Sequence, residues 1–359
     1  MPALEALRSL PTPLSRCQCV IYKDEILICG GDSNNNCYSY STAKNEYKYI
    51  CSYPEKLKLE GHCVVRLPDN KDWSGITLLS FGGGDKDKKH TLQMKYKSVW
   101  DDESSSSSSK VMEDENVNKW VKSQKKIGTE EDDYRCARAL VGGSNNHLLF
   151  ITYYPKYIAV FNLNTFEREA KGKFELKVCA NYHCFVSNGD QGIDKMARTN
   201  ANAKKAINEM LLFRKEMGLL IQYDEKNRSF DFREIGVCDD IKGVYDYGFV
   251  RVRDKILFFG GSTWIEQINV VHGYSMTTKQ WTKFDCTLPS ALKGCTAVLS
   301  ADNTFVHILG GNGNSKDINT HIKMDVSKWI DHIEAQDTVG DAKVADEDIP
   351  TSIEADIDV

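Results

Sequence analysis

The fold of this 359-residue chain is decided by the stretch Ile256-Leu257-Phe258-Phe259-Gly260-Gly261, with Tyr274 and Trp281 after it. A short apolar run bounded by turn residues is typical of a strand buried on both faces. The glycine pair that ends the run has no Cβ atoms, so the chain can take a positive φ there or let another backbone approach closely. The two aromatic residues that follow are separated by six others. The stretch therefore predicts a buried strand that stops at the glycines.

This segment recurs six times along the chain. The copies lie at residues 26–31, 78–83, 148–151, 211–213, 256–261 and 306–311. Four of the six end in Gly-Gly, and the aromatic spacing recurs from Tyr40 to Tyr47 and from Tyr223 to Phe230. Neighbouring copies are about 50 residues apart where nothing is inserted, which is the repeat length of kelch modules.

The pattern resembles the kelch repeat family, in which Gly-Gly follows the second strand of a four-stranded blade, Tyr lies in the third strand and Trp in the fourth. The resemblance covers residues 4–332 and is clearest in the fifth copy. It implies an all-β fold, a single six-bladed kelch-type β-propeller with four-stranded antiparallel blades. WD40 repeats are the nearest alternative, but their signature is matched only once, by Gly61-His62 with Trp100-Asp101.

A closed ring suits such repeats, because a lone four-stranded sheet would expose one apolar face and two edges. The expected blades span residues 12–54, 55–123, 134–178, 179–235, 236–289 and 290–332. Residues 101–118, acidic and serine-rich, are expected as an inserted loop, and residues 189–209 as an inserted loop or short helix. Two segments compete to close the ring: residues 327–330 as the last blade's own final strand, and residues 4–10 as an N-terminal clasp.

The charge distribution gives no basic stripe for nucleic acid. Residues 333–359 carry nine carboxylates and one lysine, so this stretch is predicted to be a disordered acidic tail of net charge −8. The whole chain is −5, which leaves the remainder close to neutral. We therefore expect no nucleic-acid partner.

The chain has no apolar run of the length that a secretory signal or a membrane span needs. We expect a monomeric, cytoplasmic protein with no membrane partner. Its twelve cysteines are then in a reducing compartment, where disulfides seldom persist. Acidic residues around Ser104–Ser109 suit acid-directed kinases, so phosphorylation of that stretch is a further hypothesis.

Several cysteine and histidine residues are candidate metal ligands. Cys19, Cys63 and Cys184 are expected to open the first strands of their blades as small buried side chains. Two candidate sets, Cys17 with Cys19 and Cys179 with Cys184 and His183, lack the Cys-x-x-Cys spacing of a zinc site. His62 and His183 directly precede two of these cysteines, and two imidazoles near the axis could hold copper or iron. The kelch resemblance implies instead a structural hydrogen-bonding role for both histidines.

Resemblance to metal-dependent kelch proteins is weaker. Asp317 and His321 have the spacing of two of the three iron ligands of nitrile-specifier proteins, but Gly313 stands in place of the Glu. The galactose oxidases of the same fold are secreted, and this chain shows no secretion signal. The glycines of residues 82–86 lack the spacing of a phosphate-binding loop. We therefore predict no catalytic, cofactor-binding or metal-binding residues and no cofactor.

The expected function is that of a non-catalytic protein-protein interaction scaffold or adaptor, because a rigid ring presents variable loops on two faces. The resemblance implies cytoskeletal or ubiquitin-pathway proteins as partners. The alternative is a metal-dependent or oxidase-like propeller enzyme that uses the channel mouth.

Overall fold

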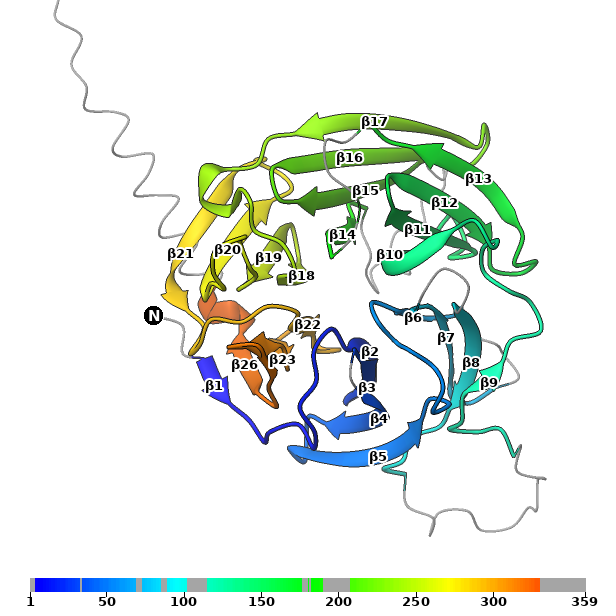
Figure 1. Cartoon of the computed structure of the whole chain (residues 1–359), viewed down its shortest axis with the longest axis horizontal. Helices are drawn as coiled ribbons and strands as arrows, with labels where there is room; N and C mark the ends of the chain where they lie inside the picture. The colour runs from blue at the N-terminus through cyan, green and yellow to red at the C-terminus, as the bar shows by residue number, and fades with distance from the viewer. Residues whose placement is uncertain are drawn as a thin grey trace, which may run out of the picture.

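The computed structural model describes residues 4–329 except 33, 69–72, 85–88, 102–114, 176–179, 181 and 190–206. The described chain forms six four-stranded antiparallel sheets. Figure 1 shows them arranged as blades around one axis. The predicted all-β, six-bladed propeller is confirmed.

In the first three blades the strands follow one another from the axis outward. They are β2 (Gln18–Tyr22), β3 (Glu25–Gly31), β4 (Asn34–Ser41) and β5 (Glu46–Ser52); β6 (Cys63–Arg66), β7 (Ile76–Gly82), β8 (His90–Tyr96) and β9 (Val121–Lys122); and β10 (Asp133–Gly142), β11 (Leu148–Tyr154), β12 (Tyr157–Asn162) and β13 (Arg168–Lys173). Neighbouring first strands contact one another around the axis, as β2 does with β6.

Blades 4 and 5 repeat this order, and blade 6 departs from it. Their strands are β14 (Cys184–Ser187), β15 (Ile207–Arg214), β16 (Met217–Asp224) and β17 (Ser229–Ile235); β18 (Gly248–Val252), β19 (Lys255–Phe259), β20 (Val270–Ser275) and β21 (Trp281–Thr287); and β22 (Thr296–Leu299), β23 (Phe305–Leu309), β26 (His321–Asp325) and β1 (Leu4–Ala6). A small hairpin, β24 (Asn312–Gly313) and β25 (Lys316–Asp317), lies between β23 and β26.

The N-terminal strand closes the ring. β1 is the outermost strand of blade 6 and pairs antiparallel with β26, with Leu4 opposite Met324 and Ala6 opposite Ile322. Residues 326–329 are helical, so the competing expectation of a strand at residues 327–330 is wrong. The clasp is also shorter than the expected residues 4–10.

The apolar core is divided among the spaces between blades. The described residues form six clusters of buried side chains, and each cluster contains residues of two neighbouring blades. β3 shows why, because every residue from Glu25 to Gly31 is buried. One face of such a strand packs against the preceding blade and the other against the next. Each buried aliphatic side chain contributes about 1.5–3 kcal/mol, so the blades stabilise one another.

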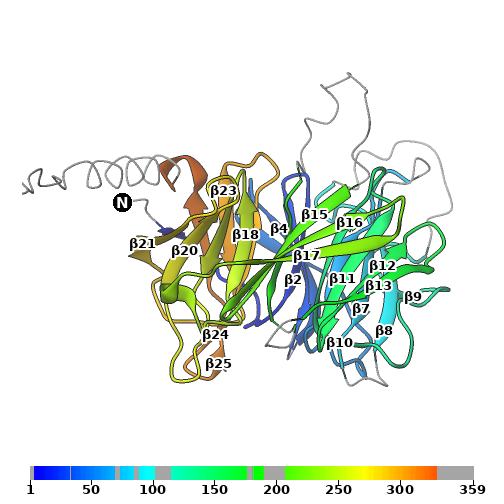
Figure 2. The same cartoon turned by 90° about the horizontal axis from the view of Figure 1, so that it is seen from above.

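The two faces of the ring differ in what they carry. On the Gly-Gly face, the second strands end and the first strands begin, and the hairpin β24–β25 projects from it (Figure 2). The opposite face is the tight-turn face. There, short turns such as residues 23–24 and 42–45 join consecutive strands.

One predicted insertion has a different boundary. β15 begins at Ile207, so residues 207–209 belong to a strand and not to the insertion expected at 189–209. Residues 102–114, which include Ser104–Ser109, and residues 330–359, which include the predicted acidic tail, lie outside the described residues. Cys179 does as well. No helix in the described chain is long and apolar enough to cross a membrane.

Candidate functional site

The recurring glycines allow close packing between neighbouring blades. A Cβ atom at Gly310 would lie 2.2 Å from the carbonyl oxygen of Leu14, and one at Gly260 would lie 2.4 Å from that of Leu292. Leu14 and Leu292 lead into blade 1 and blade 6, so each glycine admits the backbone of the next blade. The Gly-Gly signal of the sequence therefore has a structural role.

The third copy takes a different register from the expected one. Thr152 pairs with Arg138 as Phe81 pairs with Cys63, so residues 153–154 occupy the glycine positions. The repeat pattern of the sequence places residues 151–152 at the glycine positions, so the observed register is two residues later than expected. Tyrosines fill these positions in blade 3, which is why the motif is missing there.

A second repeated contact explains the histidines that precede the cysteines. Nε2 of His62 lies 2.9 Å from the carbonyl oxygen of Cys29 in blade 1. At the same place in blade 5, the Tyr247 hydroxyl donates to the carbonyl oxygen of Phe213 in blade 4 at 2.7 Å. Each contact joins the start of one blade to the end of the second strand of the preceding blade. The side chain at this position therefore links its blade to the preceding one by a hydrogen bond, and the position is called the latch position below.

His183 occupies the same latch position in blade 4. Its Nε2 lies 2.6 Å from the Thr152 hydroxyl of blade 3, and both His62 and His183 are fully buried. The two histidines contact neighbouring blades instead of facing each other across the axis. Their geometry matches the structural role that the sequence favoured and not the metal-binding alternative.

The cysteines are small buried side chains in most positions. Cys63 and Cys184 pair with Phe81 and Phe213, so these two positions are equivalent. Cys19 lies one residue later in its blade, because Gln18 takes that position opposite Cys29. The expected equivalence of Cys19 with the other two is therefore wrong. The eleven cysteines of the described chain are all free.

The structure does not bring Asp317 and His321 together as the iron-ligand pattern would require. Asp317 lies in the surface hairpin, where its Oδ1 accepts a hydrogen bond from Asn312 at 3.0 Å. His321 is buried in β26 between the Tyr47 hydroxyl and His307. No group of three His, Cys, Asp or Glu side chains among the residues described could hold a metal ion.

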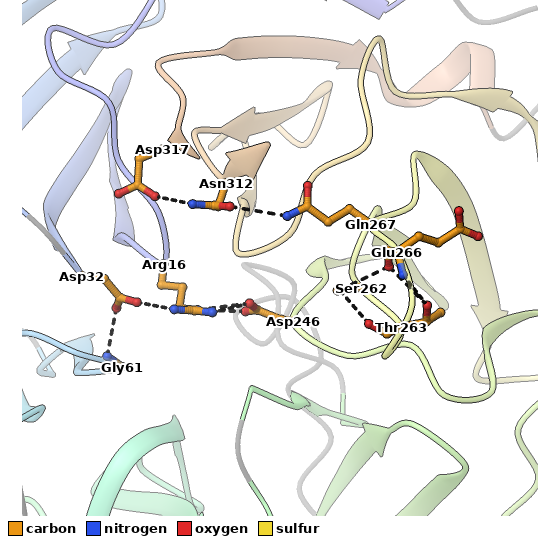
Figure 3. Close-up of polar contacts among 10 residues, drawn as sticks. All are labelled: Arg16, Asp32, Gly61, Asp246, Ser262, Thr263, Glu266, Gln267, Asn312 and Asp317. Carbon is orange, nitrogen blue, oxygen red and sulfur yellow. Dashed lines mark hydrogen bonds and ion pairs between the residues drawn. The ribbon is translucent and has the colours of Figure 1, made fainter. Parts of the chain in front are cut away.

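An ion-pair cluster lies near the axis on the Gly-Gly face. The Arg16 guanidinium donates to both carboxylate oxygens of Asp246 and to Asp32, and Figure 3 shows it between the two acids. The Asp246 side chain is only 2% exposed. The aromatic ring of Tyr182 lies 4.1 Å from the guanidinium carbon, and the Gly61 amide donates to Asp32. The cluster ties blades 1, 2, 4 and 5 together.

Backbone bonds around the axis join the same residues. The Arg16 amide donates to the Gly294 carbonyl at 2.7 Å, the Gly294 amide to the Asp246 carbonyl at 2.6 Å, and the Asp246 amide to the Tyr182 carbonyl at 3.4 Å. All four residues have positive φ and stand two residues before the first strand of their blades. The centre of this face is thus a set of mutually satisfied groups.

Two large apolar side chains on the same face are exposed to solvent and are not buried by the fold. Trp264 is 81% exposed and Ile265 is 94% exposed, in the loop between β19 and β20. The loop is internally braced, since Thr263 Oγ1 accepts hydrogen bonds from the amides of Ile265 and Glu266 at 3.2 and 3.1 Å. The Lys215 ammonium lies 4.0 Å from the centre of the Trp264 ring.

The loop is also supported by blade 6. The Gln267 side chain donates to Asn312 Oδ1 at 3.4 Å and accepts from the Asn314 amide at 3.2 Å. Figure 3 shows Gln267, Asn312 and Asp317 as a line of polar contacts from the blade 5 loop to the hairpin. Neither Trp264 nor Ile265 was predicted from the sequence as a functional residue. Two apolar residues among polar ones after a glycine pair were the available signal.

Burial of a histidine in blade 5 predicts sensitivity to acid. His272 is 2% exposed, and its burial lowers its pKa to about 4. An unfolded histidine titrates near 6.5, so the unfolded chain binds more protons between pH 6.5 and 4, and stability falls by up to about 1.4 kcal/mol per pH unit across this window. We expect His272→Gln to have a flatter dependence of unfolding free energy on pH, measured by urea titration. The unfolding free energy of each protein is compared with its own value near pH 8, which removes the packing cost of the substitution from the comparison. Parallel curves for the two proteins would contradict the prediction.

Comparison with known proteins bears on the fold. No protein-family model matches the chain. No curated protein sequence matches it either. A solved structure that does match is that of YjhT, at 12% sequence identity and a TM-score of 0.61, covering 90% of this chain and 97% of that one. At this identity the likeness is one of fold alone, so it supports the β-propeller and leaves kelch membership a prediction from the repeat pattern.

Proposed function

We propose that this chain is a non-catalytic interaction scaffold that binds a partner protein through the Gly-Gly face of blades 5 and 6. The observation that carries the proposal is the exposed Trp264–Ile265 pair on a braced loop. The partner would offer an apolar pocket for these two side chains.

Exposed aromatic residues on rigid loops are effective anchors for a partner. Burying a tryptophan removes a large apolar area from water, and tryptophan is among the residues most enriched at energetic hot spots. The bracing by Thr263 lowers the entropy lost on binding, because the loop need not be ordered by the partner. Gln267 and Asn314 beside the pair provide a polar rim.

The centre of the face supports the same proposal. Arg16 is paired with both Asp32 and Asp246, so these charges stabilise the contacts between blades. The kelch-like repeat pattern adds support from the sequence, and it points to cytoskeletal or ubiquitin-pathway proteins in the cytoplasm as the partner class.

The test is affinity purification from cells with a matched control. A Trp264→Ala/Ile265→Ala variant is expected to lose its partner, with at least about tenfold weaker binding when the captured protein is purified and titrated. Tyr49→Ala removes another exposed aromatic side chain, 56% exposed on the outer strand of blade 1, and is expected to bind as wild type. A partner retained equally by all three proteins would refute the assignment of this face. No partner enriched by the wild type would refute the scaffold itself.

A further inference from the structure

A cavity of about 390 Å³ lies between blades 6 and 1 on the tight-turn face. Its walls come from the β2–β3 and β4–β5 turns, the β22–β23 loop and the closing strand β1. The Trp264 loop belongs to the opposite face, so a ligand in this cavity would bind independently of the proposed partner protein. A cavity of this size falls in the range of small-molecule sites.

The blade 6 wall of the cavity holds a buried imidazole with one unused ring nitrogen. His307 is 2% exposed and lines the cavity. Its Nδ1 lies 2.9 Å from Nε2 of His321, whereas its own Nε2 has no hydrogen-bond partner among the residues described. This nitrogen is not sealed in the core, so it opens onto the cavity. A polar atom in such a place favours a ligand that supplies the missing hydrogen bond.

A tyrosine at the other end of this chain of rings determines which nitrogen of His307 carries the proton. The Tyr47 hydroxyl lies 2.6 Å from Nδ1 of His321, and this is its only hydrogen bond within the described part of the chain. Burial raises the pKa of Tyr47 and lowers the pKa of His307 to about 4 and that of His321 to about 3. At neutral pH the phenol is therefore protonated, and both imidazoles are uncharged.

The three groups can be hydrogen-bonded in two directions, and one direction uses more of their hydrogens. If Tyr47 donates to Nδ1 of His321, the proton of His321 is on Nε2 and is donated to Nδ1 of His307. The proton of His307 is then on Nε2, facing the cavity. In the reverse direction the Tyr47 hydroxyl hydrogen would have no acceptor in the described chain, so the first direction is favoured. His307 thus presents an N–H donor to the cavity.

A lysine next to His307 adds a positive charge to this wall. Lys323 of β26 lies directly opposite His307 of β23, so the two side chains are neighbours on one face of the sheet. The Lys323 ammonium lies 4.6 Å from the centre of the Phe305 ring, which also lines the cavity, and 3.0 Å from Oε2 of Glu5. The Glu5 side chain is 58% exposed, so this ion pair contributes little and a ligand carboxylate can replace it.

The other carboxylates at the cavity do not compete for the buried donor. Asp24 and Asp302 are exposed, so solvent screens their charges. Glu25 faces the other side of the blade 1 sheet, where its carboxylate accepts hydrogen bonds from Ser39 and Tyr96. The buried part of the cavity therefore combines an N–H donor and an ammonium group with apolar walls.

We propose that this cavity binds a small monocarboxylate with an apolar body, held between Nε2 of His307 and the ammonium group of Lys323. One carboxylate oxygen accepts a hydrogen bond from the imidazole, and the other accepts one from the ammonium group. Both bonds are charge-assisted, which makes them stronger than bonds between neutral groups. The side chains of Ile21, Ile26 and Phe305 line the same cavity and would contact the apolar body.

Calorimetric titration of the full chain with benzoate, benzamide and benzylamine tests the charge of the ligand. We expect saturable binding of benzoate with a dissociation constant below about 2 mM. Benzamide has nearly the same shape but no charge, so it should bind at least about tenfold more weakly, and benzylamine should not bind. No saturable binding of benzoate up to about 20 mM would overturn the proposal. Benzamide or benzylamine binding as tightly as benzoate would overturn it too.

Variants test whether benzoate occupies this cavity. Lys323→Met and His307→Phe should weaken binding at least about tenfold, whereas Lys316→Met, on the β24–β25 hairpin of the other face, should leave it unchanged. Glu5→Gln removes the carboxylate that competes for Lys323, so it should strengthen binding about two- to fivefold. This exposed substitution keeps the test decisive if the buried variant does not fold. Wild-type affinity in Lys323→Met, or weaker binding in Glu5→Gln, contradicts the site.

Nitrogen-15 NMR of the histidine rings tests the direction of the hydrogen bonds without a ligand. Both His307 and His321 are expected to carry their proton on Nε2 at neutral pH, and the His307→Phe spectrum identifies the signals of His307. Benzoate should shift the Nε2 signal of His307 in the wild type. A proton on Nδ1 of His307 would make Nε2 an acceptor, which cannot bind a carboxylate, and would refute the proposal.

Discussion

Gly310→Ala is expected to lower the free energy of unfolding by about 3–5 kcal/mol, one of the two largest effects foreseen for a single substitution in this chain. Gly310 has a φ of +59°, a conformation that costs an alanine about 1–2 kcal/mol. The added Cβ would also lie 2.2 Å from the Leu14 carbonyl oxygen. That oxygen is backbone, and it accepts a hydrogen bond from the Gly311 amide, so it cannot move aside cheaply.

Two other glycines separate the two costs. Gly243 also has a positive φ, +79°, but a Cβ there would meet nothing within 4 Å. Gly243→Ala should therefore show the conformational cost alone. Gly236 has neither feature, and its replacement by alanine should change stability by less than about 0.5 kcal/mol. Urea denaturation of the three variants gives the comparison. Equal losses for Gly310→Ala and Gly243→Ala would show that the close approach between blades carries no energy.

The glycine pairs also explain why so much of the fold could be predicted. A requirement for close backbone approach recurs wherever one blade meets the next, so it leaves the same two letters in four copies of the repeat. Where a blade has other residues at these two positions, the Gly-Gly pair is absent from the sequence. Blade 3 has Tyr153 there, and its hydroxyl donates to the buried Asp132, while blade 4 has Lys215 with a φ of +51°. The apolar runs still mark those two blades.

Ring closure and the candidate sites were harder to predict, for a shared reason. The pairing of β1 with β26 joins segments at opposite ends of the sequence, and three residues of strand carry almost no local pattern. Arg16 and Asp246 are 230 positions apart, so no spacing could connect them. The Trp264–Ile265 pair was visible, but its exposure depends on a loop conformation that periodicity does not describe.

The second large effect concerns the ion-pair cluster near the axis. Arg16→Met is expected to lower the free energy of unfolding by about 3–5 kcal/mol, because it leaves the 2%-exposed Asp246 carboxylate buried without its cation. Arg16→Lys keeps the charge but cannot donate to two carboxylates with a planar fork, so an intermediate loss is expected. The exposed pair Arg233 and Asp231 is the control, and Arg233→Met should cost less than about 0.5 kcal/mol.

A double-mutant cycle identifies the source of that loss. Asp246→Asn removes the buried charge and suits the backbone, because asparagine tolerates the positive φ of +59° at this position. If the uncompensated carboxylate causes the instability, Arg16→Met should cost far less in the Asp246→Asn background than in the wild type. Urea denaturation of the four proteins measures the coupling. Additive losses would mean that Arg16 acts through packing on Tyr182, and that the ring is held at this point by contact and not by charge.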